Sequence, residues 1–412
     1  MNTKPLNIWM LQISETLPLT EKIRKTRTAL LCDELAARGH SIVWWASAFD
    51  HAEKKWIAQD DEVRQLAPGV KVHFLTGCGY TKNISVKRLW DHRLVARKFA
   101  ARAQAQPRPD IIVASMPSYD FAYYAARLAQ KWGIPYIIDI RDQWPDSFFN
   151  RRPFPLRQIA RTLLAYDSYM LNYQVRHADS VLSMMDGLLQ WGLKKAGRPQ
   201  TSQDKVFYIG AAKPPKPEYP NIFNLPSDKF VVAFIGTFGT HSSPTVLLRA
   251  AQRLKDRKDI LIVLGGGGEN YDNLVSQAKG LQNLRFTGWL NSEQIYSLLN
   301  HSHAGVVAGA PGVAAFPNKS FVYFSMGLPV ISNAEGELRQ FLEKNSTGLY
   351  FSNDSDADLA EQIVKLKDNP ELHKTMRENS RRAFEQHFDA KKLYADYADH
   401  VEEIAAEREK NH

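Results

Sequence analysis

Hydrophobic and polar residues along the chain follow two periods that alternate with one another. Short, nearly continuous apolar runs predict buried strands, and segments with apolar residues three or four positions apart predict amphipathic helices. The first half gives strands in "LNIWMLQ", "SIVWWAS", "PDIIVAS" and "IPYIIDI", with helices in "RKTRTALLCDELAARGH" and "FAYYAARLAQKWG". Strands that alternate with helices in this way are typical of parallel sheets with crossover helices.

The same rhythm restarts in the second half, with "FVVAFIGTFG", "SPTVLLRAAQRLKD", "DILIVLGGGG" and "AGVVAGA". Between the halves, "YIGAAKPPKPEYPNIFNLPSDK" contains five prolines, which exclude a helix and suit a stiff connector. The 412 residues also exceed what one core usually serves. We therefore predict two doubly wound, Rossmann-like α/β domains that face each other across a cleft, over residues 1–205 and 206–388. Residues 389–412 are predicted to form a helix, and the N-terminal domain is its expected packing partner.

The net charge of +9 is unevenly distributed. Up to Gly210 the chain carries 30 Lys and Arg against 19 Asp and Glu, whereas the remainder carries 23 against 25. Such a basic half suits nucleic acid, an anionic membrane surface or phosphorylated substrates. No helix-turn-helix, zinc-finger or single-strand-binding pattern accompanies the charge, so we expect no nucleic acid partner.

Features of targeting are absent from the sequence. The opening residues show no signal-peptide pattern, and no apolar run approaches the ~20 residues that span a bilayer. The two cysteines have no metal or redox spacing, which suits a reducing compartment. We therefore expect a cytoplasmic protein.

Two motifs of the second half lie where this fold binds ligands, just beyond the carboxyl ends of strands. Gly236, Thr237, Phe238 and Gly239 follow the strand "VVAFI", and glycines there let backbone N–H groups approach a phosphate. The stretch Pro317-Asn318-Lys319-Ser320 opens a helix, whose positive end repels a lysine unless both share an anion. Together they predict a diphosphate site. Each motif alone also fits a structural role, a tight turn or an exposed lysine beside a helix start.

The first strand is followed by "QISETLPLTEKIRK", which contains no glycine. The dinucleotide-binding fingerprint should appear at this point, so a nicotinamide dehydrogenase is disfavoured.

A cluster of charged residues follows "IPYIID" in the first domain, running from Asp139 to Asp146. Asp142 and its neighbour Arg141 are the predicted catalytic residues of this domain, since a carboxylate there can position or deprotonate a hydroxyl group. Trp144 and Asp146 are predicted on the acceptor side, where tryptophan commonly stacks on a sugar ring. The alternative is an Arg–Asp pair that only orders the loop.

Several stretches resemble family four of the GT-B glycosyltransferases, which includes bacterial capsule, exopolysaccharide and O-antigen transferases. They are "ELAARGHSIVWWAS", "RDQWPDS", "FIGTFGTHSSPTVLLRAAQRL", "NLRFTGWLNSEQIYSLL" and "PNKSFVYFSMGLPVISNAEGEL". The resemblance as a whole extends over nearly the whole chain. The resemblance implies that Lys319 and the amides of the Gly236–Gly239 loop hold the diphosphate of a nucleotide sugar. It also implies a retained anomeric configuration. Fixed dipoles and an ammonium group stabilise the departing diphosphate, so no metal or other cofactor is expected.

The sequence departs from the family pattern at the nucleotide. Val322 and Ala314 occupy the positions of two family glutamates, of which the one at Val322 contacts the ribose. The family's Arg and Lys are replaced within Thr240-His241-Ser242, and Ile209-Gly210-Ala211 stands for the family's "NG-D". Glu335 and Glu337 are the candidates for holding the ribose instead.

These observations predict an enzyme that moves a sugar from a nucleotide-sugar donor to a glycan acceptor, lipid-linked, in bacterial surface polysaccharide synthesis. Basic residues mixed with aromatic ones over 82–102 and 148–161 also predict peripheral association with an anionic membrane. Two alternatives stay open. A nucleotide-sugar epimerase shares this two-domain organisation and needs no acceptor, and a non-catalytic sugar-nucleotide binder fits the lost glutamates.

Overall fold

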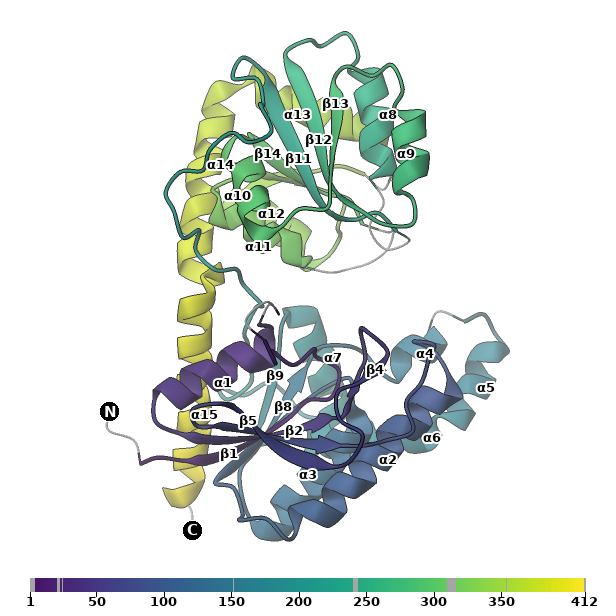
Figure 1. Cartoon of the computed structure of the whole chain (residues 1–412), viewed down its shortest axis with the longest axis vertical. Coiled ribbons are helices and arrows are strands. Elements are labelled where there is room, and N and C mark those ends of the chain that lie inside the picture. The colour runs from purple at the N-terminus through teal and green to yellow at the C-terminus, as the bar shows by residue number, and fades with distance from the viewer. Residues whose placement is uncertain are drawn as a thin grey trace. The chain divides into compact units, whose positions relative to one another are not determined.

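The computed structural model describes residues 4–20, 23, 25–150, 152–239, 244–309, 316–352 and 354–410. The chain divides into two compact units (Figure 1). The N-terminal unit comprises Met1–Tyr208 and Tyr394–His412, and the C-terminal unit comprises Ile209–Leu393. The boundaries predicted after residues 205 and 388 lie within a few residues of these limits.

The N-terminal unit is built on one sheet with the strand order β10-β9-β8-β7-β1-β2-β6-β5. All neighbours run parallel except β5, which is antiparallel to β6. The strands are β1 (Asn7–Leu11), β2 (Ser41–Ser47), β5 (Glu62–Ala67), β6 (Val70–Leu75), β7 (Ile111–Ser115), β8 (Tyr136–Ile140), β9 (Ser180–Ser183) and β10 (Lys205–Val206), beside a small hairpin of β3 (Phe49–Asp50) and β4 (Lys55–Trp56). The helices are α1 (Arg27–Ala37), α2 (Val86–Ala103), α3 (Tyr119–Trp132), α4 (Asp146–Asn150), α5 (Leu156–Leu163), α6 (Ala165–Arg176), α7 (Asp186–Ala196) and the closing α15 (Ala390–Lys410).

Large aromatic side chains fill the core of this unit. Trp9 of β1 packs edge-on against Trp45 of β2 at 5.2 Å, and Phe99 of α2 lies 5.1 Å from Trp45. Helix α15 packs on the same unit, where Tyr397 stacks on Phe207 with ring centroids 4.7 Å apart. Burying such rings removes much apolar surface from water, which is the main stabilising contribution to a core of this kind.

The C-terminal unit has a fully parallel sheet with the order β13-β12-β11-β14-β15-β16. Its strands are β11 (Phe230–Thr237), β12 (Ile260–Gly267), β13 (Leu284–Gly288), β14 (Ala304–Val307), β15 (Val330–Ser332) and β16 (Gly348–Tyr350). Its helices are α8 (Thr245–Arg253), α9 (Tyr271–Gln277), α10 (Ser292–Asn300), α11 (Asn318–Ser325), α12 (Glu337–Asn345), α13 (Asp356–Asp368) and α14 (Pro370–Ala383), followed by the π-helical turn η1 (Phe384–Phe388).

Both units share one topology, which confirms the predicted pair of doubly wound α/β domains. In each, the first strand is central, the next strands extend to one side, and the later ones extend to the other. The order therefore reverses between β1 and β7 and between β11 and β14, and ligands of such sheets bind beside this switch point. None of the described helices is both long and apolar enough to cross a membrane.

Candidate functional site

Lys319 lies at the start of α11, close to the switch point of the C-terminal sheet. Its Nζ is 4.0 Å from the centroid of the Phe234 ring on β11. A Cβ atom at Gly236 would lie only 2.8 Å from this Nζ, and the φ of +150° at Gly236 favours glycine there. Burial lowers the pKa of Lys319 to about 7, because the charged ammonium loses its water shell. The structure therefore brings together two of the predicted donor-binding residues, Lys319 and Gly236.

Tyr323 fixes the position of α11 over the two strands of the switch point. Its buried hydroxyl donates to the carbonyl of Val306 on β14 at 3.1 Å and accepts from the amide of Ile235 on β11 at 3.0 Å. Gly305 leaves room for the ring, since a Cβ atom there would lie 2.4 Å from it. Lys319 is one helical turn before Tyr323, so this anchor places the lysine beside Gly236. Sequence reasoning missed Tyr323, although its spacing of four residues from Lys319 was a usable signal.

The glycine loop after β11 packs against the end of β12. A Cβ atom at Gly266 would lie 1.8 Å from the carbonyl oxygen of Gly236, which explains the glycine there. Phe238 needs a correction, because its ring is fully buried and stacks on Tyr271 while its amide donates to the carbonyl of Gly267 at 2.8 Å. Phe238 is thus a core residue, and the loop presents Gly236, Thr237 and Gly239 at the surface.

The other predicted donor-side residues differ in exposure. Asn318 is exposed at the first position of α11, whereas Ser320 is fully buried and its Oγ has no hydrogen-bond partner among the described residues. Glu335 is exposed and accepts from the Tyr350 hydroxyl at 3.4 Å, and Glu337 begins α12. Both glutamates follow β15, at the sheet edge that also carries the ends of β11 and β14.

In the N-terminal unit, Asp139 is fully buried between two arginines. It accepts from Arg27 of α1 at 2.8 and 3.0 Å and from Arg141 at 2.8 Å. Burial alone raises the pKa of a carboxyl group, but the charges of Arg27 and Arg141 outweigh it and lower the pKa of Asp139 to about 2. Asp139 therefore fits the alternative interpretation, in which an Arg–Asp pair only orders the loop.

Arg141 connects the elements around the switch point of this sheet. Its Nη2 donates to the hydroxyls of Thr28 on α1 at 3.0 Å and Ser115 on β7 at 2.9 Å, and its Nη1 pairs with Glu15 after β1. Every nitrogen of its guanidinium thus bonds to the protein, which makes Arg141 a positioning residue. Its neighbour Asp142 is exposed, with one oxygen accepting from the amide of Gln143 at 2.7 Å. Of these two adjacent candidates, Asp142 is the one that offers a carboxylate at the surface.

Trp144 and Asp146 have protein partners. Trp144 is only 8% exposed, with the Arg88 guanidinium 4.4 Å from its ring centroid and Phe148 at 4.6 Å. Asp146 accepts from the indole of Trp191 at 3.1 Å and pairs with Lys195 at 2.7 Å, both on α7. Trp144 therefore packs among side chains rather than offering an open face for a sugar, and Asp146 ties α4 to α7.

Comparisons with known proteins agree with this architecture. Residues 25–194 match the model of a glycosyl transferase 4-like domain, and residues 215–383 match that of the glycosyl transferases group 1. Among solved structures, HepE from Anabaena in complex with UDP superposes with a TM-score of 0.63 over 95% of this chain and 98% of that one, at 16% identity. Sucrose-phosphate synthase from Thermosynechococcus elongatus gives a TM-score of 0.68 over 97% and 99%, also at 16% identity.

The chain has the GT-B fold of the glycosyltransferases. Among curated proteins it is 34% identical over 159 residues to O-antigen chain mannosyltransferase C of Escherichia coli, which is 38% of this chain and 42% of that protein. It is 21% identical over 278 residues to alpha-D-kanosaminyltransferase of Streptomyces kanamyceticus, covering 63% and 68%. The matched region thus spans less than half of the first of these relatives and about two thirds of the second.

Two departures from the family pattern fall on described residues, at Val322 on α11 and at Ile209-Gly210-Ala211 at the start of the C-terminal unit. Val322 is partly exposed on α11, one residue before the anchoring Tyr323. Ala314 and Thr240-His241-Ser242 lie outside the described residues. Where the structure describes the chain, no three His, Cys, Asp or Glu side chains are placed to hold a metal ion.

Two substitutions compare the buried carboxylate of Asp139 with the exposed carboxylate of Asp142. Asp139→Asn leaves two buried guanidinium groups without their shared counter-charge, so we expect a loss of ~3–5 kcal/mol in the free energy of unfolding. The matched change Asp142→Asn, three residues away at the surface, is expected to stay within ~0.5 kcal/mol of wild type. Urea unfolding of the wild type and the two variants measures both changes in the free energy of unfolding. Equal stability of all three proteins would contradict the structural role of Asp139.

Proposed function

We propose that this protein is a glycosyltransferase that moves a sugar from a nucleotide-sugar donor to a glycan acceptor. The observation that carries the proposal is the approach of the Lys319 ammonium to Gly236 at the switch point of the C-terminal sheet. The amino end of α11 lies at the same place, so a charged side chain and helix N–H groups can act on one phosphate group. The glycosyltransferase models that match both domains support this reading over that of an epimerase.

The proposed chemistry is breakage of the bond between the sugar and the diphosphate. Negative charge then develops on the diphosphate, and Lys319 with the end of α11 stabilises it without a metal ion. Transfer with retained configuration follows from the family resemblance and is part of the proposal. Asp142, the exposed carboxylate beside the buried Arg27–Asp139–Arg141 network, is the residue we assign to the acceptor hydroxyl or the sugar during transfer.

The proposed acceptor is a lipid-linked glycan of bacterial surface polysaccharide synthesis, reached from the cytoplasm. The similarity to an O-antigen chain mannosyltransferase supports this acceptor class. The surplus of basic residues before Gly210 supports peripheral association of the N-terminal unit with an anionic membrane. A thermal-shift screen with UDP-, GDP- and ADP-sugars identifies the donor. Incubation with that donor alone then tests the function, because a change of the sugar without any acceptor indicates an epimerase.

Lys319→Ala should weaken donor binding ~30- to 200-fold, because the variant loses a charge-assisted hydrogen bond to a phosphate that contributes ~2–3 kcal/mol. Titration calorimetry with the donor found in the screen measures it. The control is Lys344→Ala, which removes an exposed lysine of the same unit.

The affinity should also depend on pH in a defined direction. With a pKa of about 7, the amine of free Lys319 is largely neutral above pH 7 and must take up a proton when the diphosphate binds. Donor affinity is therefore expected to fall by up to about tenfold per pH unit above pH 7. The affinity of Lys319→Ala for the donor is expected to depend less on pH. Wild-type affinity in the variant would exclude the diphosphate assignment.

Asp142→Asn should lower kcat by at least about tenfold while leaving donor affinity within about twofold, since a group that acts during transfer affects turnover more than ground-state binding. Asp60→Asn, another exposed carboxylate of the N-terminal unit, is the control for charge alone. Unchanged turnover in Asp142→Asn would show that the catalytic group lies elsewhere.

Membrane association is tested by flotation with liposomes. We expect the protein to float with anionic vesicles and to be released as salt is raised, because each surface Lys or Arg contributes ~1 kcal/mol that ions screen. Changing the exposed Arg152, Arg157 and Arg161 to Glu should abolish flotation. Changing Lys255, Lys258 and Lys279 of the C-terminal unit to Glu alters the net charge equally and should leave it intact. Equal binding to neutral vesicles would contradict the electrostatic part of the proposal.

A further inference from the structure

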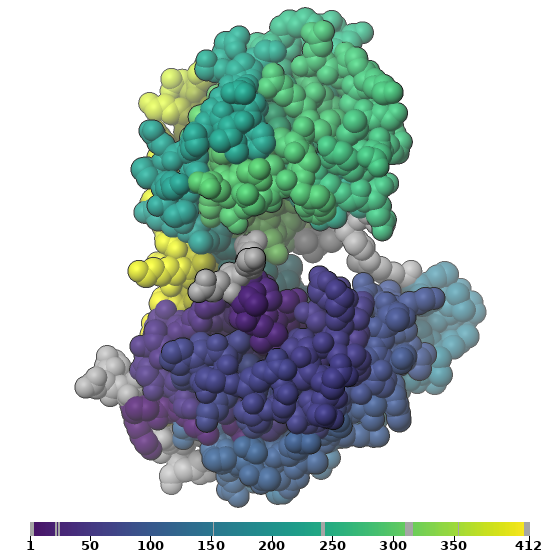
Figure 2. Space-filling view, in the orientation of Figure 1, coloured from purple at the N-terminus to yellow at the C-terminus, as the bar shows by residue number. Residues whose placement is uncertain are grey.

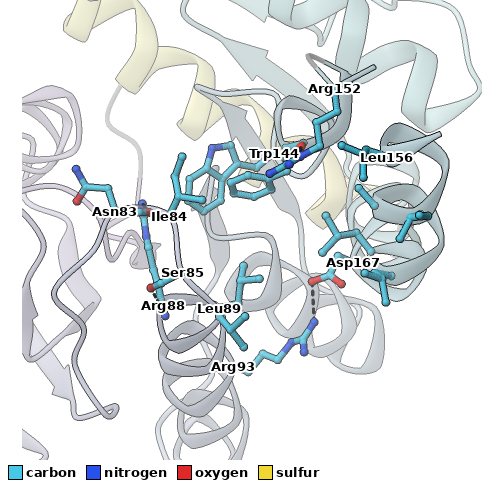
Figure 3. A pocket seen from close by; sticks show the side chains of 16 residues that line it. Asn83, Ile84, Ser85, Arg88, Leu89, Arg93, Trp144, Arg152, Leu156 and Asp167 are labelled. Carbon is cyan, nitrogen blue, oxygen red and sulfur yellow. Dashed lines mark hydrogen bonds and ion pairs between the residues drawn. The ribbon is translucent and has the colours of Figure 1, made fainter. Parts of the chain in front are cut away.

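A groove of about 540 Å³ lies within the N-terminal unit, between the start of α2 and the helices α4 to α6 (Figure 3). Its walls are mainly apolar and include Ile84, Leu89, Trp144, Leu156, Ile159 and Leu163. Its volume falls within the range of about 300–1,000 Å³ that small-molecule sites occupy. None of the candidate donor-site residues lines this groove.

Helix α5 forms one wall of this groove and has no buried residue. Leu156, Ile159 and Leu163 fall on one face at helical spacing, yet they remain 51%, 53% and 76% exposed. Figure 1 shows α5 at the margin of its unit, and Figure 2 shows the same segment as a projecting lobe. A helix with an apolar face that no part of its own unit covers marks a surface that meets a ligand or another apolar phase.

The charges around the groove are unequal. Arg93 forms an ion pair with Asp167 at 2.7 Å, which closes the groove between α2 and α6 (Figure 3). At the end near Trp144, Arg88 donates to the carbonyl of Asn83 at 2.7 Å, and Arg152 donates to that of Phe148 at 3.0 Å. Within the described parts of the chain, no carboxylate forms a salt bridge with Arg88 or Arg152. Arg88 is buried, bonds to Tyr80 and interacts electrostatically with Asp142 and Asp91, whereas Arg152 is exposed. This end of the groove therefore combines an apolar channel with positive charge, of which the Arg152 guanidinium is the more accessible part.

We propose that the groove binds the hydrocarbon chain of the lipid-linked acceptor, with the phosphate of that lipid near Arg88 and Arg152. The inference rests on the proposed glycosyltransferase function and extends it to the lipid. An apolar chain matches the walls, and an anionic head matches the arginines. Trp144 at this end lies two residues after Asp142, so a lipid phosphate held there leaves the first sugar close to the proposed catalytic loop.

The experiment uses farnesyl diphosphate, a soluble isoprenoid diphosphate, as the probe for the full-length protein in titration calorimetry. Binding is expected without any nucleotide sugar and weaker for farnesol. In Lys319→Ala, which lacks the proposed donor-diphosphate site, binding of inorganic diphosphate should be undetectable while farnesyl diphosphate still binds. Ala160→Trp places an indole in the groove from α5 and should weaken binding by at least about tenfold, because the chain loses its contact surface. Phe154→Asp is the control, since Phe154 is 75% exposed in the same segment and does not line the groove. It should bind the probe like wild type.

Further outcomes separate this proposal from its alternatives. Binding of the probe should persist in Lys319→Ala, and its loss there would place the probe at the diphosphate site and overturn the groove assignment. Wild-type affinity in Ala160→Trp would overturn it as well, as would binding of inorganic diphosphate to Lys319→Ala with the affinity of farnesyl diphosphate. A dimer in sedimentation equilibrium that Ala160→Trp dissociates would assign the groove to a second copy instead. Because no sugar is transferred in these measurements, failure of the transferase function would leave their result unchanged.

Discussion

In each sheet, one polar side chain bridges the elements on the two sides of the switch point. In the C-terminal unit, β11 and β14 pair only at their beginnings, and the Tyr323 hydroxyl bonds both strands further along. In the N-terminal unit, Arg141 bonds the end of β7, the start of α1 and the turn after β1. Tyr323 bonds backbone groups, which are costly to leave unpaired in the interior, whereas Arg141 bonds polar side chains that converge on it. The candidate residues Gly236, Lys319 and Asp142 lie beside these bridges.

The bridges also set the electrostatics of the two sites in opposite ways. In the N-terminal unit the two positive charges of Arg27 and Arg141 are matched by the carboxylates of Asp139 and Glu15, and Asp139 stays ionised at neutral pH. In the C-terminal unit, the anchor of α11 holds Lys319 against an aromatic ring and glycine backbone, an environment that disfavours its charge. The first arrangement stabilises the fold. In the second, a bound anion would stabilise the charged form of Lys319.

Sequence reasoning could predict what depends on local pattern. The alternation of periods indicated the two parallel sheets, and the strand-end rule selected Gly236 and Lys319, which do lie together. It could not predict orientation. Phe238 and Asp146 stand in the right loops, yet the ring of one enters the core and the carboxylate of the other turns to α7. Contacts between distant residues were also invisible, since Arg27 is 112 positions from Asp139 and Glu15 is 126 from Arg141. Nothing in a single sequence links such partners.

The exposure of α5 bears on how this protein can diverge over evolution. A helix with no buried residue adds little to the cooperative stability of its unit, so substitutions along it meet weak selection for folding. The sheet and the Arg27–Asp139–Arg141 network, in contrast, tolerate few changes. Substitutions on the apolar face of α5 can therefore change the walls of the groove at little cost to folding, and under the proposed function they would alter which lipid the protein accepts.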